Sequence, residues 1–173
     1  MTEKERINKF TELAWKVVPE RVISDLVDKG YFTAPASTKY HGNYEGGLFD
    51  HSYEVTDALI KLTKKLDLYW LNERSPILIG LFHDLCKVDN YIFNGEYYEY
   101  CTDTLLKGHG DKSVMMLANY FTLTEEEIMC IRYHMGAFTD KEEWRDYTRA
   151  VNRYPNVLWT HTADMLASHV MGV

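Results

Sequence analysis

The stretch ILIGLFHDLC, residues 77–86, decides the fold expected for this chain. It is apolar nearly all round, and Ser75-Pro76 just before it supplies an N-cap serine and a proline for the first helical turn. A helix that is apolar on every side belongs in the protein interior. We therefore expect a central, buried helix that carries His83 and Asp84, a polar pair that burial makes costly unless it is paired or metal-bound.

Helical periodicity extends to both sides of this central helix. A strong apolar stripe predicts a helix from about Gly47 to Leu66, with His51 on its buried face. Residues 31–47 lack any period and predict a long loop, a kind of segment that is often functional. Two further helices are expected before this region, at about residues 3–17 and 20–30. Four more are expected after it, beginning near residues 108, 124, 140 and 155, and the third of these spans about 140–150. The helix from 124 begins with a Thr124–Glu127 capping box. The predicted fold class is all-α, a helical bundle.

One short segment departs from the helical pattern. In YIFNGEYYEY, residues 91–100, two aromatic-rich runs flank Asn94-Gly95, a strong signal for a tight β-hairpin. Its rings offer a stacking surface for a base beside the site, but they also suit a cover over an exposed core edge, and we favour that packing role. The rings concerned are Tyr91, Phe93, Tyr97, Tyr98 and Tyr100.

Composition limits the class of protein. The 173 residues, 46% apolar and 26% charged, suit one domain over 1–173. The net charge is −7 and the pI about 5.5, without a clustered basic surface, so long nucleic acid is disfavoured as a partner. No apolar run is long enough for a membrane span, and the charged N-terminus lacks a signal-peptide core, so we expect a cytoplasmic location. Three scattered cysteines indicate free thiols.

Six ionisable residues stand at buried or half-buried positions of separate predicted helices or helix starts. Each alone is most often a hydrogen-bonded core residue. Together they follow the order H, HD, H, H, D at intervals of 25 to 32 residues, which lets neighbouring helices aim their side chains at one point. They are His51, His83, Asp84, His109, His134 and Asp164. Imidazoles and carboxylates without thiolates suit one or two divalent ions of Mn, Fe, Co, Ni or Zn, with Mg also possible.

Around these residues the sequence resembles the HD-domain superfamily of metal-dependent phosphohydrolases. The motifs are GGLFDHS at 46–52, LFHDLCK at 81–87, GHGDKS at 108–113, RYHMG at 132–136 and HTADMLAS at 161–168. The order is similar to the two-metal branch and to the HD module of certain bacterial 3′-to-5′ exoribonucleases. The resemblance covers residues 46–168. In it, Cys86 replaces the usual glycine of HDIGK, and the hairpin is an insertion without a counterpart.

The resemblance implies a role for each position. His51, His83, Asp84 and Asp164 would hold the first metal, and His109 and His134 would join Asp84 at the second. Asp84 and Lys87 would be catalytic, with Lys87 oriented toward a phosphoryl group or the attacking water. Lys87, Lys112 and His41 are the substrate-binding candidates. His161 and His169, on the last helix, are either supports for the metal ligands or ordinary imidazoles.

The function expected on these grounds is metal-dependent hydrolysis of a small phosphorylated substrate. A metal-activated water would attack a nucleotide-like phosphomonoester or phosphodiester. Two alternatives stay open from sequence: an HD-fold di-iron oxygenase and a non-catalytic ligand-sensing module. Serine-elbow, P-loop and dinucleotide-binding motifs are absent from the sequence, which disfavours those chemistries.

Overall fold

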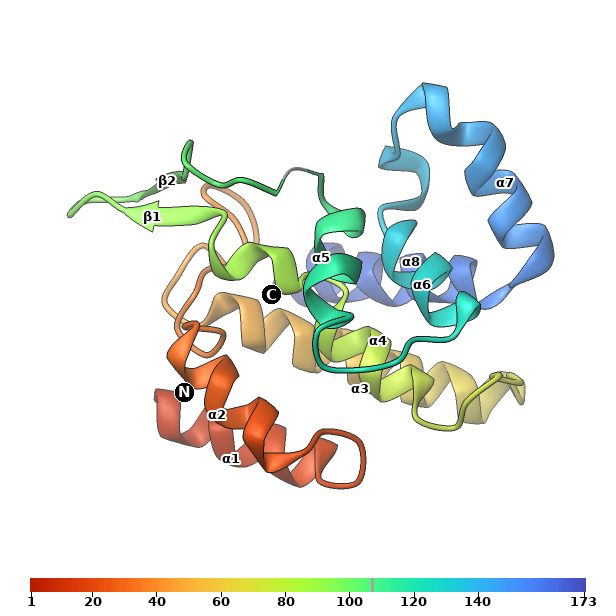
Figure 1. Cartoon of the computed structure of the whole chain (residues 1–173), viewed down its shortest axis with the longest axis horizontal. Coiled ribbons are helices and arrows are strands. Elements are labelled where there is room, and N and C mark those ends of the chain that lie inside the picture. Colours follow the sequence, from red (N-terminus) through yellow and green to blue (C-terminus); the bar gives the residue numbers. More distant parts are fainter. Residues whose placement is uncertain (107) are drawn as a thin grey trace.

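The computed structural model describes residues 1–106 and 108–173. Over these residues the fold has eight α-helices and a small antiparallel hairpin, as predicted (Figure 1). The α-helices are α1 Glu3–Ala14, α2 Glu20–Asp28, α3 Gly47–Leu66, α4 Ser75–Phe82, α5 Gly110–Leu117, α6 Glu125–Arg132, α7 Trp144–Arg153 and α8 Asn156–Met165. Short 3-10 segments lie at Leu85–Val88, Gly136–Phe138 and Lys141–Glu143, and a π-helical turn at Leu166–Met171.

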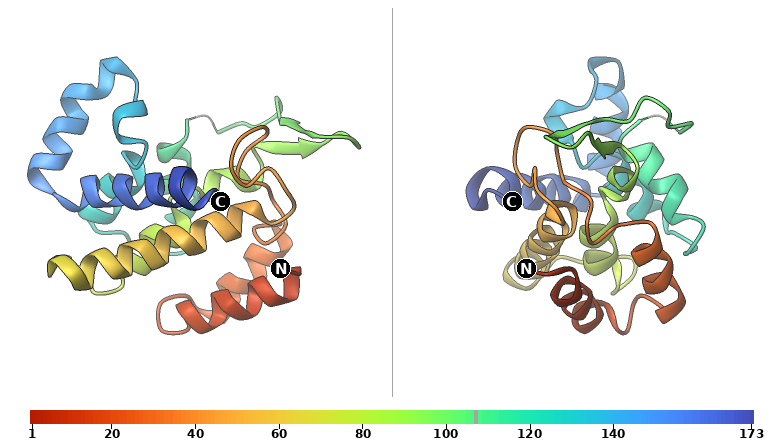
Figure 2. Two further views of the ribbon diagram at one scale, coloured as in Figure 1. Left: turned by 180° about the vertical axis from the view of Figure 1, so that it is seen from behind. Right: turned by 90° about the vertical axis from the view of Figure 1, so that its left-hand side faces the viewer.

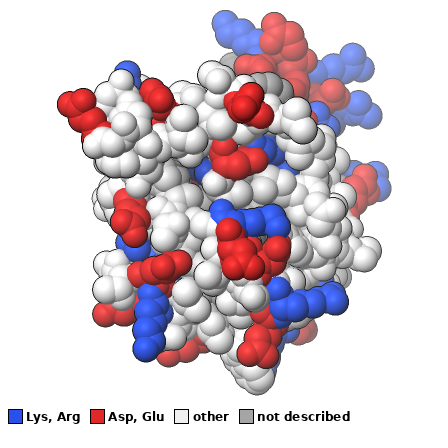
Figure 3. All heavy atoms as spheres, turned by 60° about the vertical axis from the view of Figure 1, so that its left-hand side comes forward, with Lys and Arg blue, Asp and Glu red and all other residues white. Residues whose placement is uncertain are grey.

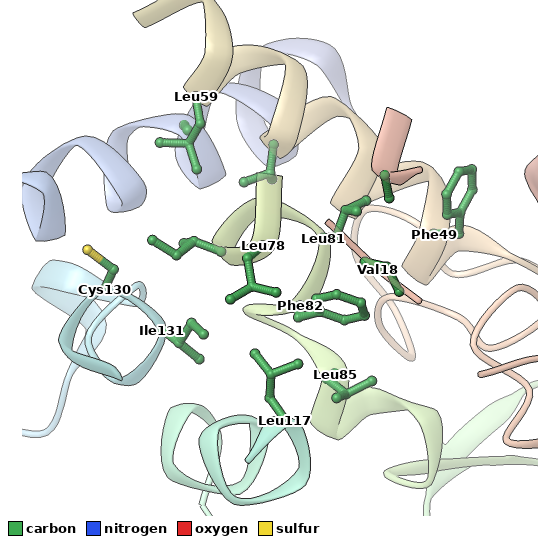
Figure 4. Close-up of a cluster of buried hydrophobic side chains, with 14 of the residues drawn as sticks. Val18, Phe49, Leu59, Leu78, Leu81, Phe82, Leu85, Leu117, Cys130 and Ile131 are labelled. Carbon is green, nitrogen blue, oxygen red and sulfur yellow. The ribbon is translucent and has the colours of Figure 1, made fainter. Parts of the chain in front are cut away.

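Helices α3 and α4 form the centre of the molecule. Gly80 of α4 lies so close to α3 that a Cβ there would collide with the backbone and side chain of Thr56. Leu78 and Phe82, both fully buried, belong to the same apolar cluster as Ile131 of α6 (Figure 4). The apolar run therefore forms the buried central element that its composition predicts.

The central helix is shorter than expected, because it ends at Phe82 and not beyond Asp84. Its last carbonyls find partners outside the helix: the His83 ring Nδ1 donates to the Gly80 oxygen at 2.9 Å, and the Tyr31 hydroxyl donates to the Leu81 oxygen. Carbonyls satisfied in this way let a buried helix end without leaving polar groups orphaned. His83 and Asp84 consequently lie in a turn between α4 and a 3-10 segment.

A second difference concerns Ser75, which is the first residue of α4 and not its N-cap. Its hydroxyl donates to the Glu127 carboxylate at 3.1 Å. Glu127, fully buried, also completes the predicted capping box with Thr124 and accepts from Arg74. One carboxylate thus fixes the start of α6 against the start of α4. The first helix also ends earlier than predicted, at Ala14.

Strands β1 (Tyr91–Phe93) and β2 (Tyr98–Tyr100) pair antiparallel, with Asn94 and Gly95 in the turn as predicted. The hairpin projects from the helical body beside the 31–46 loop (Figures 1 and 2). Among the helices described, none has the length and apolarity that crossing a membrane requires. On the face in Figure 3, lysine and arginine side chains alternate with acidic ones.

Candidate metal centre

The six predicted ligand side chains converge at one place. His51 comes from α3, His83 and Asp84 from the turn after α4, His109 from the residue before α5, His134 from the segment after α6, and Asp164 from α8. Their ligand atoms form three overlapping groups that could each hold a metal ion. The groups are His51–His83–Asp84, His83–His134–Asp164 and Asp84–His109–His134.

Asp84 is the common member, and its two oxygens face different histidines. Oδ2 lies 3.6 Å from His51 Nε2 and 3.4 Å from His83 Nε2. Oδ1 lies 2.8 Å from His109 Nε2 and 3.4 Å from His134 Nε2. The carboxylate therefore divides the cluster into two halves, each with its own oxygen.

The histidine rings are oriented by backbone carbonyls. Nδ1 of His83 donates to Gly80 and Nδ1 of His134 donates to Ile131 at 2.6 Å, each three residues back at a helix end. Nδ1 of His51 donates to the backbone oxygen of Val173 at 3.0 Å. A neutral imidazole that donates from Nδ1 carries its lone pair on Nε2. The fold thus presents Nε2 lone pairs toward the centre of the cluster.

These lone pairs have spacings that fit metal ligands. His51 Nε2 lies 3.2 Å from His83 Nε2 and 3.2 Å from Asp164 Oδ1. Two ligands about 2.0–2.1 Å from one ion, at tetrahedral or octahedral angles, are roughly 2.8–3.4 Å apart. His134 Nε2 is buried and has no hydrogen-bond partner in the part of the chain that is described. Facing lone pairs and a buried unpaired nitrogen are unfavourable unless a cation binds between them.

Charge inside the cluster is balanced by Lys87. Its ammonium lies 2.7 Å from Asp84 Oδ2, and both side chains are nearly fully buried. Burial alone raises the pKa of Asp84, but Lys87 and the neighbouring histidines outweigh it and hold that pKa well below its usual range. Burial likewise lowers the pKa of Lys87, and the Asp84 carboxylate more than reverses this effect. The pair is therefore ionised near neutral pH.

The two histidines on Asp84 Oδ1 differ. Burial lowers the pKa of His109, but the Asp84 carboxylate and Cys86 outweigh it and raise that pKa to about 10. The pKa of His134 is lowered, chiefly by burial. Cys86 Sγ lies 3.7 Å from His109 Nδ1, so the cysteine that replaces the expected glycine contacts a predicted ligand. The sequence shows the replacement but gives no sign of this contact.

The two remaining substrate-binding candidates, His41 and Lys112, differ in what their side chains contact. The His41 ring lies 5.0 Å from the His51 ring, and burial together with His51 and Lys87 lowers the pKa of His41 to about 4. Lys112 is instead buried, with Nζ 2.5 Å from Asp89 and 2.8 Å from Asn90. Its ammonium is engaged inside the protein, and the substrate-binding role predicted for it gains no support.

The two histidines of the last helix also differ. His161 Nδ1 donates to the backbone oxygen of His134 at 2.9 Å, and a Cβ at Gly136 would collide with the His161 ring. His161 therefore supports the segment that carries a predicted ligand. His169 is exposed and contacts the neighbouring Ser168 hydroxyl, so it is a surface imidazole.

Among curated proteins, the chain is similar to the dihydroneopterin 2′,3′-cyclic phosphate phosphodiesterase of Methanocaldococcus jannaschii. The two are 37% identical over 94 residues, which cover 49% of this chain and 38% of the relative. The chain thus matches well under half of the relative's length. No family model matches the sequence. No solved structure matches it significantly.

Proposed function

We propose that the chain is a metal-dependent phosphohydrolase of the HD superfamily, acting on a small, nucleotide-like phosphomonoester or phosphodiester. The observation that carries this proposal is Asp84, whose two oxygens face two separate sets of histidine nitrogens at ligand spacings. Carboxylates that bridge two ions are typical of two-metal hydrolytic sites. The similarity to a phosphodiesterase over half of the chain supports the same class of reaction.

In this proposal, His51, His83, Asp84 and Asp164 would hold one ion, and Asp84, His109 and His134 would hold the other. The donor set is nitrogen and oxygen only, which suits Mn, Fe, Co, Ni or Zn better than Mg. Bound metal ions would lower the pKa of a coordinated water toward neutrality and polarise the phosphoryl oxygens.

The chain's own residues then bind and orient the substrate. The Lys87 ammonium keeps donors beyond the one that contacts Asp84, and they would neutralise charge that develops on a phosphoryl oxygen. His41, with its low pKa, would meet the substrate at neutral pH as an uncharged imidazole. For a cyclic phosphodiester, a water oxygen bonds to phosphorus and loses a proton, one ester P–O bond breaks, and the released alkoxide takes up a proton in exchange.

The proposal is tested by phosphate-ester hydrolysis after metal reconstitution. The purified chain is loaded with Mn²⁺ or Fe²⁺ and assayed on nucleoside monophosphates, on 2′,3′-cyclic nucleotides and on dihydroneopterin cyclic phosphate. Asp84→Asn should reduce turnover by about 10³-fold or more, because a charge stabilisation of several kcal/mol is lost. Asp57→Asn is the matched control, since this α3 aspartate pairs with Lys61 at the surface.

Two outcomes would contradict the proposal. Equal turnover of wild type and Asp84→Asn would remove Asp84 from the reaction. Dioxygen consumption by the iron-loaded chain, without hydrolysis of any phosphate ester, would favour the oxygenase alternative instead.

A further inference from the structure

The hairpin gathers four aromatic rings on one face. Side chains of a strand alternate between its two faces, so Tyr91 and Phe93 point to the same side. Their cross-strand partners, Tyr100 and Tyr98, join them there, and each pair of ring centroids is 5.2 Å apart. Ile92 lies on the opposite face.

Two of the four rings are exposed and the other two, Tyr91 and Tyr98, are half-buried, so the packing role favoured from sequence stays a prediction. Phe93 is 59% exposed and Tyr100 is 68% exposed. None of the four rings belongs to the buried apolar cluster of the described residues or packs against it. Exposed aromatic side chains grouped in this way mark a binding surface more often than a structural one.

A cavity of about 420 Å³ separates this aromatic face from the 31–46 loop. Its volume falls within the usual range for small-molecule sites, about 300–1,000 Å³. The loop is anchored by backbone hydrogen bonds, such as Gly46 to Thr33 at 2.8 Å, so the wall opposite the rings is fixed. The lining includes Pro35, Glu45, Val88, Tyr91, Phe93 and Tyr98.

Both walls of the cavity lead back to the candidate metal centre. Val88 directly follows Lys87, whose ammonium lies 2.7 Å from Asp84. The opposite loop carries His41, whose ring is 5.0 Å from that of His51. The cluster also affects Tyr91 electrostatically: burial, Tyr100 and then Asp84 raise the pKa of the Tyr91 hydroxyl. The cavity lining is therefore joined to the cluster through neighbouring residues on both of its sides.

The charge of the lining gives the ligand an orientation. Glu45 is the one charged residue among the described residues that line the cavity. A carboxylate repels a phosphate group and accepts hydrogen bonds from N–H donors. Glu45 therefore disfavours the phosphate end of a substrate at its side of the cavity and favours an N–H-rich ring edge there.

We propose that this cavity binds the heterocyclic ring of a phosphoester substrate, with the ring against Phe93 and Tyr98 and an N–H-bearing edge toward Glu45. The inference rests on the proposed function and specifies its substrate class. The favoured rings are those with adjacent N–H donors, such as the 2-amino-4-oxo edge shared by guanine and pterins.

Binding of phosphate-free rings tests the cavity without any turnover. The full metal-loaded chain is titrated calorimetrically with neopterin, guanosine and adenosine. Phe93→Ala and Tyr98→Ala should each weaken neopterin and guanosine binding by about tenfold, the size expected for one lost stacking contact. Tyr97→Ala is the matched control, because Tyr97 is 56% exposed on the same hairpin but outside the cavity lining.

Glu45→Gln sharpens the test. It should weaken guanosine and neopterin binding more than adenosine binding, because adenine presents a bare ring nitrogen where guanine presents N–H. A further arm measures KM for a 2′,3′-cyclic nucleotide and for glycerol cyclic phosphate, which has no ring. The Phe93 and Tyr98 variants should raise KM for the first substrate only.

The outcomes separate this inference from the proposed function. If wild type hydrolyses phosphate esters but binds neither neopterin nor guanosine, the cavity proposal is overturned and the function stands. If these rings bind in the expected order without hydrolysis of any phosphate ester, the cavity stands and the function fails. Equal losses in Tyr97→Ala and Phe93→Ala would also overturn the cavity proposal.

Discussion

The His/Asp cluster and the aromatic hairpin break the ordinary rules of burial in opposite ways. In the cluster, His51 and His83 are fully buried, although their Nε2 atoms face each other. On the hairpin, large rings such as Phe93 stand in solvent. Polar groups are normally satisfied when buried, and large grouped apolar surfaces are normally covered.

The difference shows how each region is supported. The cluster is held by surrounding elements: carbonyls of Gly80 and Ile131 fix two ligand rings, and Lys87 balances the charge of Asp84. The hairpin contributes no ring to the buried apolar cluster of the described residues. Mutations should therefore affect stability and metal binding in the first region, and substrate binding alone in the second.

The largest expected effect is on stability, at Phe82 of α4. This ring is fully buried beside the cluster. Phe82→Ala should lower the free energy of unfolding by about 3–5 kcal/mol, because it leaves a cavity in the core. Chemical denaturation monitored by circular dichroism measures the change. A loss below about 1 kcal/mol would mean that α4 is not the centre of the core.

A smaller effect is expected at His161, which holds the His134 carbonyl at 2.9 Å. His161→Ala should weaken metal affinity about 10- to 100-fold, the usual result of removing a group that orients a ligand. Competition with a chelator of known affinity gives the number. His169→Ala is the control, because His169 is exposed, and its metal affinity should stay near that of the wild type. Equal metal affinities of the His161→Ala and His169→Ala variants would show that His161 has no supporting role.

Metal binding near His109 should depend on pH. With a pKa of about 10, His109 is protonated at pH 7 in the metal-free protein, and a metal must displace that proton. Affinity for this ion should therefore fall by up to about tenfold for each pH unit below 10. Without metal the sign is reversed: the stability from the His109–Asp84 pair is present below pH 6.5 and is lost as pH rises through about 10.

Calorimetry in two buffers of different ionisation enthalpy measures the protons released on metal binding. One proton per ion is expected at pH 7 for the ion on His109. The absence of proton release would show that His109 is neutral before binding or does not bind the metal.

The smallest effect is expected on the hairpin. Phe93→Ala should change the free energy of unfolding by less than about 0.5 kcal/mol, as for exposed positions in general. It forms a matched pair with Phe82→Ala, because the residue type and the truncation are the same. Similar losses in both variants would remove the contrast between the two regions.

Much of the fold could be predicted from sequence, because the positions of the helices and of the hairpin depend on the local spacing of apolar and turn residues. The apolar stripe placed α3 and His51, and Asn94-Gly95 placed the hairpin turn. The end of α4 could not be predicted, because it depends on the Tyr31 hydroxyl, which is 50 residues away from its acceptor Leu81.

The site shows the same division. The ligand order predicted that six side chains converge, and they do. Which groups bind the side chains around this cluster depends on three-dimensional packing, which the sequence periodicity does not predict. Lys112 looked available for an anion, yet Asp89 and Asn90 bind its ammonium. That Tyr98 and not Tyr97 lines the cavity likewise depends on β2 beginning at Tyr98, opposite Phe93.

The most direct test of the central claim is the metal content of three proteins, wild type, His109→Ala and Asp84→Ala, purified after identical Mn²⁺ loading and measured by elemental analysis. If Asp84 bridges two ions, wild type should bind two, His109→Ala one, and Asp84→Ala none. Circular dichroism confirms that each variant is folded. Full metal retention in folded Asp84→Ala would contradict the claim that this carboxylate unites the site.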